Sequence, residues 1–156
     1  GNAGMDALTK AYMADNVIWR IATDEIFHAL RNSGNDTIDA FGGDGSDSIA
    51  INGGDGDDAI TVDAGDGDDN VSIIGYTGID SIIYIVSEGV DDVLLDGGSE
   101  VDSVTVQSVV TDNFTIYDAV GNVLFTKGTG GSTITVNDPP DLIVMVDGVQ
   151  EYPPIP

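Results

Sequence analysis

The chain has 156 residues, of which 28 are Asp or Glu and only 4 are Lys or Arg, so its formal net charge is −24. Such a chain lacks the basic patches that bind phosphate, and nucleic acid is therefore excluded as an expected partner. Cysteine is absent, which excludes disulfides, thiolate metal sites and cysteine nucleophiles, and no apolar run is long enough to predict a membrane span.

The first segment, residues 1–30, is predicted to form an N-terminal cap, because repeat proteins need atypical ends. Within it, residues 5–15 are predicted to form a short helix and residues 17–21 a strand. The last eleven residues of this segment, RIATDEIFHAL from Arg20, fit the register of the eleven-residue repeats that begin at residue 31, with Glu25 at the sixth position. His28 is the only histidine, and we expect it to be a packed or surface residue rather than a metal ligand.

Residues 31–107 consist of seven blocks of eleven residues in one unbroken register. The blocks read RNSGNDTIDAF, GGDGSDSIAIN, GGDGDDAITVD, AGDGDDNVSII, GYTGIDSIIYI, VSEGVDDVLLD and GGSEVDSVTVQ. The fourth position is Gly in the first six blocks, and the eighth and tenth positions are almost wholly apolar. The sixth position is always Asp, at Asp36, Asp47, Asp58, Asp69, Asp80, Asp91 and Asp102.

Each block predicts a six-residue turn followed by a strand, because apolar and polar residues alternate in its Val- and Ile-rich second half. The turn glycines suit a backbone with positive φ. Such short strands need neighbours, and parallel stacking joins the eighth and tenth positions of all blocks into one core. With two blocks per coil, turns at one edge come from alternate blocks, about 4.8 Å apart along the stack. The sequence therefore predicts an all-β chain with a right-handed parallel β-roll, a β-solenoid, over residues 31–107.

In this arrangement the sixth-position aspartates form a file of like charges along each edge. Two unit charges about 4.8 Å apart repel by roughly 3 to 4 kcal/mol at an effective dielectric constant near 20. Calcium is the expected counter-ion, because it accepts six to eight hard oxygen ligands in flexible geometry, whereas magnesium requires a stricter octahedron. Transition metals prefer imidazole or thiolate ligands, which these turns lack. Acidic turns that are merely solvated are the alternative.

The segments GGDGSDSIA from Gly42 and GGDGDDAIT from Gly53 resemble the repeats-in-toxin motif G-G-x-G-x-D-x-U-x, in which U is a large apolar residue, with two further strand residues in each repeat. The resemblance covers about the middle half of the chain. In that family calcium lies between turns of alternate repeats, and secreted bacterial chains fold when they meet extracellular calcium. The resemblance therefore implies calcium ligands, as carboxylates or turn carbonyls, at Asp36, Asp47, Asp58, Asp69, Asp80, Asp91, Gly43, Gly45, Gly54, Gly56, Gly65 and Gly67.

Residues 108–150 are predicted to form a C-terminal β cap of antiparallel strands, with turns at residues 121–122 and 128–131. Residues 141–148 are predicted to be its last strand and turn. This ending is similar to the C-terminal cap that follows the repeats in many type I secreted proteins. The remaining residues, 151–156, are expected to be an extended tail.

Together these patterns predict a calcium-binding structural module. The family resemblance implies that it belongs to a secreted bacterial protein, lies outside the cell or at its surface, and is similar to a C-terminal type I secretion region. The alternative is an adhesive, polysaccharide-binding or surface-layer module whose outer face binds polysaccharide or neighbouring copies. An enzyme is not expected, because the chain has no cysteine, one histidine and no serine with an acid–base partner at a readable spacing.

Overall fold

The computed structural model describes residues 9–11, 16–20, 26–30, 33–109, 111–137 and 141–153. Within these ranges every regular element is a β-strand, and no helix is long and apolar enough to cross a bilayer. The strands are β1 (Thr9–Ala11), β2 (Asn16–Arg20), β3 (Ile26–Leu30), β4 (Thr37–Phe41), β5 (Ser48–Asp55), β6 (Ala59–Asp63), β7 (Asn70–Thr77), β8 (Ser81–Ile85), β9 (Asp92–Gly98), β10 (Ser103–Ser108), β11 (Phe114–Asp118), β12 (Val123–Lys127), β13 (Ser132–Asn137), β14 (Asp141–Val146) and β15 (Val149–Tyr152).

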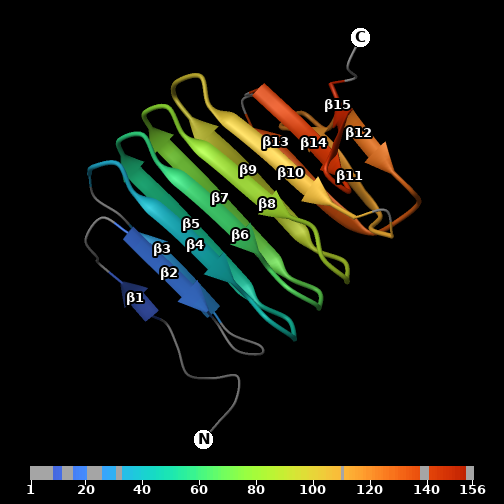
Figure 1. Cartoon of the computed structure of the whole chain (residues 1–156), viewed down its shortest axis with the longest axis horizontal. Coiled ribbons are helices and arrows are strands. Elements are labelled where there is room, and N and C mark those ends of the chain that lie inside the picture. Colours follow the sequence, from blue (N-terminus) through green and yellow to red (C-terminus); the bar gives the residue numbers. More distant parts are fainter. Residues whose placement is uncertain are drawn as a thin grey trace, which may run out of the picture.

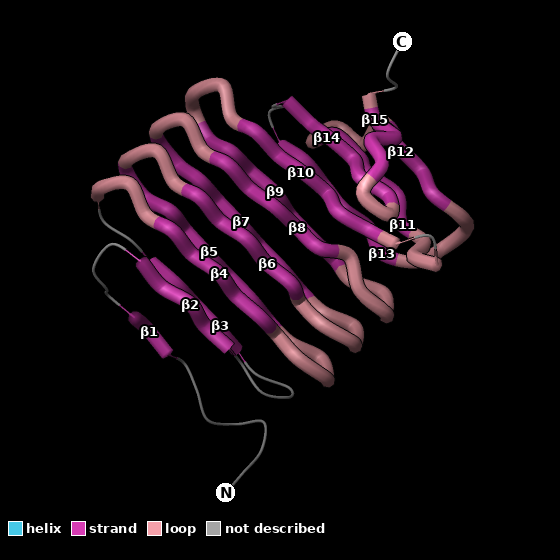
Figure 2. Tube along the Cα trace, viewed as in Figure 1, coloured by secondary structure: helices cyan, strands magenta, loops and turns pink. Residues whose placement is uncertain are grey.

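The strands form two stacked sheets, as Figure 1 shows, and successive strands alternate between them from β1 to β10. One sheet has the order β1-β3-β5-β7-β9-β13-β11-β12, and the other has the order β15-β14-β10-β8-β6-β4-β2. Neighbouring strands through the repeats are parallel and in register at a spacing of 22 residues, as in the pairs Ile49–Val71 and Ile60–Ile82. The turns gather along two edges of the stack, where Figure 2 shows the loops. The predicted all-β parallel solenoid with two blocks per coil is confirmed.

The core lies between the two sheets and is built mainly from the eighth and tenth positions of the blocks. Alternate residues of each strand point inward, as the buried Ile60 and Val62 of β6 illustrate beside the exposed Ala59 and half-buried Thr61. This alternation follows from the two-residue period of a strand. One continuous apolar core therefore runs from Ile38 to Val144 among the residues whose burial is described, and the turns are held at its edges.

The N-terminal residues extend the two sheets instead of forming a helix. The helix predicted for residues 5–15 is wrong at Thr9–Ala11, which form β1 parallel to β3, and the rest of that range lies outside the described residues. An open strand edge offers unpaired hydrogen-bonding groups, so a further strand is favoured there. β3 pairs with β5 at the 22-residue spacing, as predicted from the fit of residues 20–30 to the register of the blocks. Glu25 and the side chain of His28 lie outside the described part of the chain.

The C-terminal residues correct one predicted connection. The hairpin of β11 and β12 is antiparallel, as predicted for the turn at residues 121–122. The next turn, at residues 128–131, does not join antiparallel neighbours, because β13 lies between β9 and β11 and is parallel to both. β14 likewise continues the parallel stack against β10, and β15 then turns back antiparallel to it.

The position of β13 has a cause in its sequence. The segment KGTGGSTITVN, which begins at Lys127, has Gly at its second and fourth positions and apolar residues at its eighth and tenth. Its Ile134 and Val136 are buried opposite Val93 and Leu95 of β9. This segment is thus a further block of the solenoid, with Ser132 in place of the sixth-position Asp.

Candidate metal centre

The structure brings the sixth-position aspartates together in two files, which we call the inner files. All seven are buried, with exposed fractions between 1% and 5%. One edge carries four of them and the other edge carries three, as alternate blocks require. The inner file of the first edge is Asp36, Asp58, Asp80 and Asp102, and that of the second edge is Asp47, Asp69 and Asp91.

Five of the seven inner-file carboxylates, those of Asp58, Asp69, Asp80, Asp91 and Asp102, accept a hydrogen bond from the backbone of the stacked turn. The Asp47 N–H donates to Asp69 Oδ1 at 2.8 Å, and the Asp58 N–H donates to Asp80 Oδ1 at 2.8 Å. The same bond recurs between Asp36 and Asp58, between Asp69 and Asp91, and between Asp80 and Asp102. The bond fixes these five carboxylates between two stacked turns, which explains why the sixth position is always Asp in residues 31–107.

The first-position glycines at Gly53 and Gly75 leave room for the carboxylate of the same block. A Cβ added at Gly53 would lie 2.3 Å from Asp58 Oδ2, and one added at Gly75 would lie 2.1 Å from Asp80 Oδ2. Both distances are far below van der Waals contact. The turn therefore wraps around its own aspartate.

The second carboxylate oxygens of Asp69 and Asp80 are buried without a hydrogen-bond partner in the described part of the chain. A buried acceptor without a partner destabilises a fold by about 1–3 kcal/mol, and by more when it is charged. These two atoms lie on opposite edges of the solenoid. The turns stacked next to each of them also carry a buried aspartate. Both positions thus present an oxygen lone pair that a cation or a proton would satisfy.

The electrostatics of these two residues agree with that geometry. Burial raises the pKa of Asp69 to about 6, against the lowering effect of the Asp47 N–H, and the charges of Asp91 and Asp47 raise it further. Burial likewise raises the pKa of Asp80 to about 6, with the charges of Asp58 and Asp102 adding to the effect. Desolvation and like charge both disfavour the anion, and a bound cation would reverse both effects.

The predicted turn carbonyls lie directly beside the next turn of the stack. A Cβ added at Gly65 would lie 1.9 Å from the carbonyl oxygen of Gly43, and one added at Gly67 would lie 1.8 Å from that of Gly45. Gly67 also has a φ of +142°, which favours glycine. At Gly65 and Gly67 only glycine allows this approach. The same stacked turns thus contain both kinds of oxygen, the glycine carbonyls and the inner-file carboxylates.

The described residues contain no group of three or more carboxylate or imidazole side chains placed to hold one metal ion. A calcium ion at an inner file would need its six to eight oxygens mainly from turn carbonyls and water, with a carboxylate from the file. The donor set of the turns fits that requirement, because carbonyl oxygens and carboxylates are the hard oxygen ligands that calcium binds.

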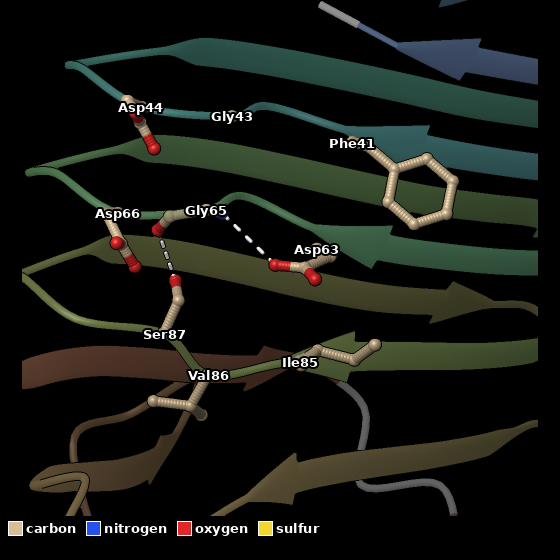
Figure 3. Close-up of a pocket in the computed structure, with 9 residues that line it drawn as sticks. All are labelled: Phe41, Gly43, Asp44, Asp63, Gly65, Asp66, Ile85, Val86 and Ser87. Carbon is tan, nitrogen blue, oxygen red and sulfur yellow. Dashed lines mark hydrogen bonds between the residues drawn. The ribbon is translucent and has the colours of Figure 1, made fainter.

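A second acidic feature lies outside the inner file, at the end of the strands. A cavity of about 350 Å³ is lined by Asp44 and Asp66 of two stacked turns and by Asp63 at the end of β6. Figure 3 shows these three side chains, with the Gly65 N–H donating to Asp63 Oδ1 at 3.1 Å. Burial raises the pKa of Asp63, and the charge of Asp66 adds to that effect. The predicted ligands Gly43 and Gly65 line the same cavity.

Sequence reasoning missed a polar file at the fifth position. There Asn35 Oδ1 accepts the Asp57 N–H, Asp57 Oδ1 accepts the Ile79 N–H, and Asp68 Oδ1 accepts the Val90 N–H. These bonds run across stacked turns on the exposed side. The repeated polar residue at the fifth position of the first four blocks is the signal that could have shown them.

Asp91 is the inner-file residue that differs most. Its Oδ1 accepts the Asp69 N–H as elsewhere, but its Oδ2 accepts the hydroxyl proton of Tyr84 at 2.8 Å. Its own N–H donates to Ser132 Oγ at 2.9 Å, because β13 follows β9 in the sheet. Sequence spacing does not reveal this contact, since Tyr84 belongs to the preceding block.

No protein-family model matches the sequence, and the searches among curated proteins and among solved structures also find no match. The interpretation of these turns therefore depends on their own geometry and chemistry.

Proposed function

We propose that the chain is a calcium-binding β-roll module with a structural, non-catalytic role. Calcium ions bind between stacked turns, where they neutralise the inner files and complete the coordination of the buried carboxylates. The observation that supports this most strongly is the buried, unpartnered Oδ2 of Asp69 and of Asp80 inside stacks of glycine-rich turns.

Calcium suits these turns better than magnesium. The carboxylates are fixed by backbone hydrogen bonds and the glycine carbonyls by close stacking of the turns. The positions of the ligands are therefore set by the solenoid, which does not arrange them as an octahedron. Calcium tolerates irregular shells of six to eight oxygens, whereas magnesium keeps several waters and requires near-ideal geometry. We expect magnesium to bind more weakly and to stabilise the fold less.

The proposed biological setting is a secreted bacterial protein that folds in extracellular calcium. A net charge of −24 opposes compaction when no cation is bound. Calcium-poor solution then favours the unfolded chain, and calcium-rich solution favours the folded one, because an ion that binds only the folded state stabilises it by mass action. Export through a type I route, suggested by the resemblance of the repeats, belongs to the same proposal.

The proposal is tested by circular dichroism during a calcium titration of chelator-treated protein, followed by thermal unfolding. We expect the strand signal and the unfolding temperature to rise with calcium and to rise less with magnesium at equal ionic strength. A strand signal and unfolding temperature that calcium leaves unchanged would contradict the proposal.

The adhesive or polysaccharide-binding alternative stays a prediction. The outward ninth positions of the sheet that contains β6 carry Asp39, Thr61, Ile83 and Thr105 in succession, which mixes charge, hydroxyl and apolar groups. Binding to a glycan array with and without calcium tests it.

A further inference from the structure

The pair of stacked turns formed by residues 64–69 and 86–91, which we call the closing rung, differs from the turn pairs before it. In the closing rung both carboxylate oxygens of Asp91 are engaged by protein groups, Oδ1 by the Asp69 N–H and Oδ2 by the Tyr84 hydroxyl. At Asp69, by contrast, Oδ2 is buried without a hydrogen-bond partner in the described residues. The carboxylate of Asp69 is bonded to the preceding turn, through the Asp47 N–H, so the carboxylate between the two turns of the closing rung is that of Asp91. That carboxylate lacks the open oxygen on which the proposed calcium binding depends.

Tyr84 reaches Asp91 from the core. It occupies the tenth position of its block, where the other six blocks carry Ala, Ile, Val or Leu, and it is fully buried. A buried tyrosine hydroxyl needs a hydrogen-bond partner, and Asp91 supplies one at 2.8 Å. Burial and the charge of Asp91 raise the pKa of Tyr84, which keeps the hydroxyl protonated and therefore a donor.

Ser87 makes the matching contact on the backbone side. It occupies the second position of its block, where the three blocks beginning at Gly42, Gly53 and Ala64 carry glycine. Its hydroxyl donates to the carbonyl oxygen of Gly65, as Figure 3 shows. That carbonyl is one of the expected calcium ligands, so a second lone pair of the closing rung is occupied by a hydroxyl proton.

The first position of the same block also departs from the pattern. Val86 stands where Gly42, Gly53 and Ala64 leave room for a carboxylate, and it is buried. Two positions of this block and one of the preceding block therefore change together: a larger residue at the first position, a hydroxyl on the stacked carbonyl, and in the preceding block a hydroxyl on the Asp91 carboxylate.

We infer that Tyr84 and Ser87 determine where calcium binding stops: their hydroxyls occupy, at the closing rung, the lone pairs that calcium occupies at the earlier rung of the same edge. This inference rests on the proposed function and adds to it a specific boundary. Calcium at the closing rung would have to displace two hydrogen bonds and leave a buried tyrosine hydroxyl without a partner, which opposes binding. The earlier rung, formed by turns 42–47 and 64–69, has glycine at both second positions.

The inference is tested by counting bound ions with native mass spectrometry in calcium, for the wild-type chain and for the double variant Tyr84→Phe/Ser87→Gly. Phenylalanine keeps the ring in the core, and glycine restores the residue of the earlier turns. We expect the double variant to bind one ion more than the wild type. Tyr117→Phe is the matched control, because it removes a hydroxyl from β11, outside the turns of the eleven-residue blocks, and should leave the ion count unchanged.

Thermal unfolding gives the second readout. In chelator the double variant should unfold at a lower temperature than the wild type, because Asp91 Oδ2 loses its donor, and saturating calcium should reduce that difference. Ser87→Gly alone, at a half-buried position, should show the same direction with a smaller effect. Equal ion counts in wild type and both variants, or a double variant that calcium fails to stabilise, would overturn the inference. A wild-type chain that binds no ion would instead refute the proposed function.

Discussion

The turns between Gly42 and Asp69 and the turns between Gly75 and Asp102 share their inner files and differ in their outer positions. The sixth-position aspartates are buried in both regions. At the fifth position the first region carries Asp57 and Asp68, whereas the second carries Ile79, Val90 and Val101, all more than half exposed. The inner carboxylate is thus required by the backbone of the turn, while the outer carboxylates are not. The additional charge of the first region is thus not needed to close the turn, and it adds to the negative charge that the proposed calcium ions would neutralise.

The largest effect is expected where turns approach most closely. Gly67→Ala combines a backbone at positive φ with a Cβ placed 1.8 Å from the Gly45 carbonyl oxygen. Strain of about 1–2 kcal/mol and overpacking of about 1–3 kcal/mol predict a loss of roughly 3 kcal/mol in the free energy of unfolding, measured by denaturant titration.

Gly130→Ala is the control for that substitution. Gly130 holds the fourth position of the block beginning at Lys127, also at positive φ, and no described atom would lie within 4 Å of its Cβ. Only the backbone strain should remain, so the loss should be about 1–2 kcal/mol. Equal losses at Gly67 and Gly130 would show that turn stacking is looser than the structure indicates.

Two substitutions of Asp69, with the next largest effect, distinguish the contribution of the inner-file hydrogen bond to stability from that of the carboxylate charge. Asp69→Ala leaves the buried Asp47 N–H without its acceptor and should destabilise the chain by about 1–3 kcal/mol in chelator. Asp69→Asn retains an oxygen acceptor without the buried charge, so in chelator at pH 7 it should unfold at or above the wild-type temperature. In calcium, however, both variants should gain less than the wild type. An Asn variant with the full calcium response would show that the carboxylate charge is not needed for binding.

Sequence reasoning succeeded where the eleven-residue period holds and failed where it does not. The period places the apolar eighth and tenth positions on one face, so β4 to β10 and the inner files follow directly from it. It could not place β13, because the hairpin of β11 and β12 separates that block from the others and Ser132 replaces the expected Asp. Nor could it reveal the contact of Tyr84 with Asp91, which depends on a core residue of one sheet reaching a turn of the next block.

A smaller effect is expected from pH in the absence of metal. The folded-state pKa values of Asp69 and Asp80 are raised to about 6 from 3.8, mainly by burial. A raised pKa means that the folded state binds protons more tightly, so these residues favour folding below pH 4 and lose that contribution as pH rises to about 6. Thermal unfolding in chelator should therefore show lower stability at pH 7 than at pH 5. Asp69→Asn should reduce this dependence, and an unchanged dependence would assign it to other groups.

The smallest effect is expected at the outer positions. Asp57→Ala removes an exposed acceptor of the Ile79 N–H, and we expect a loss below about 1 kcal/mol in the free energy of unfolding. Asp44→Ala, which removes an exposed acid from the third position, serves as a control for the loss of charge. A loss at Asp57 as large as that of Asp69→Ala would remove the distinction between inner and outer carboxylates.

The most direct test of the central claim is anomalous X-ray diffraction from crystals of the wild-type chain grown in calcium. We expect an anomalous peak between turns 42–47 and 64–69, bonded to Asp69 Oδ2 and to turn carbonyl oxygens. Well-ordered turns with no ion beside Asp69 or Asp80 would contradict the account.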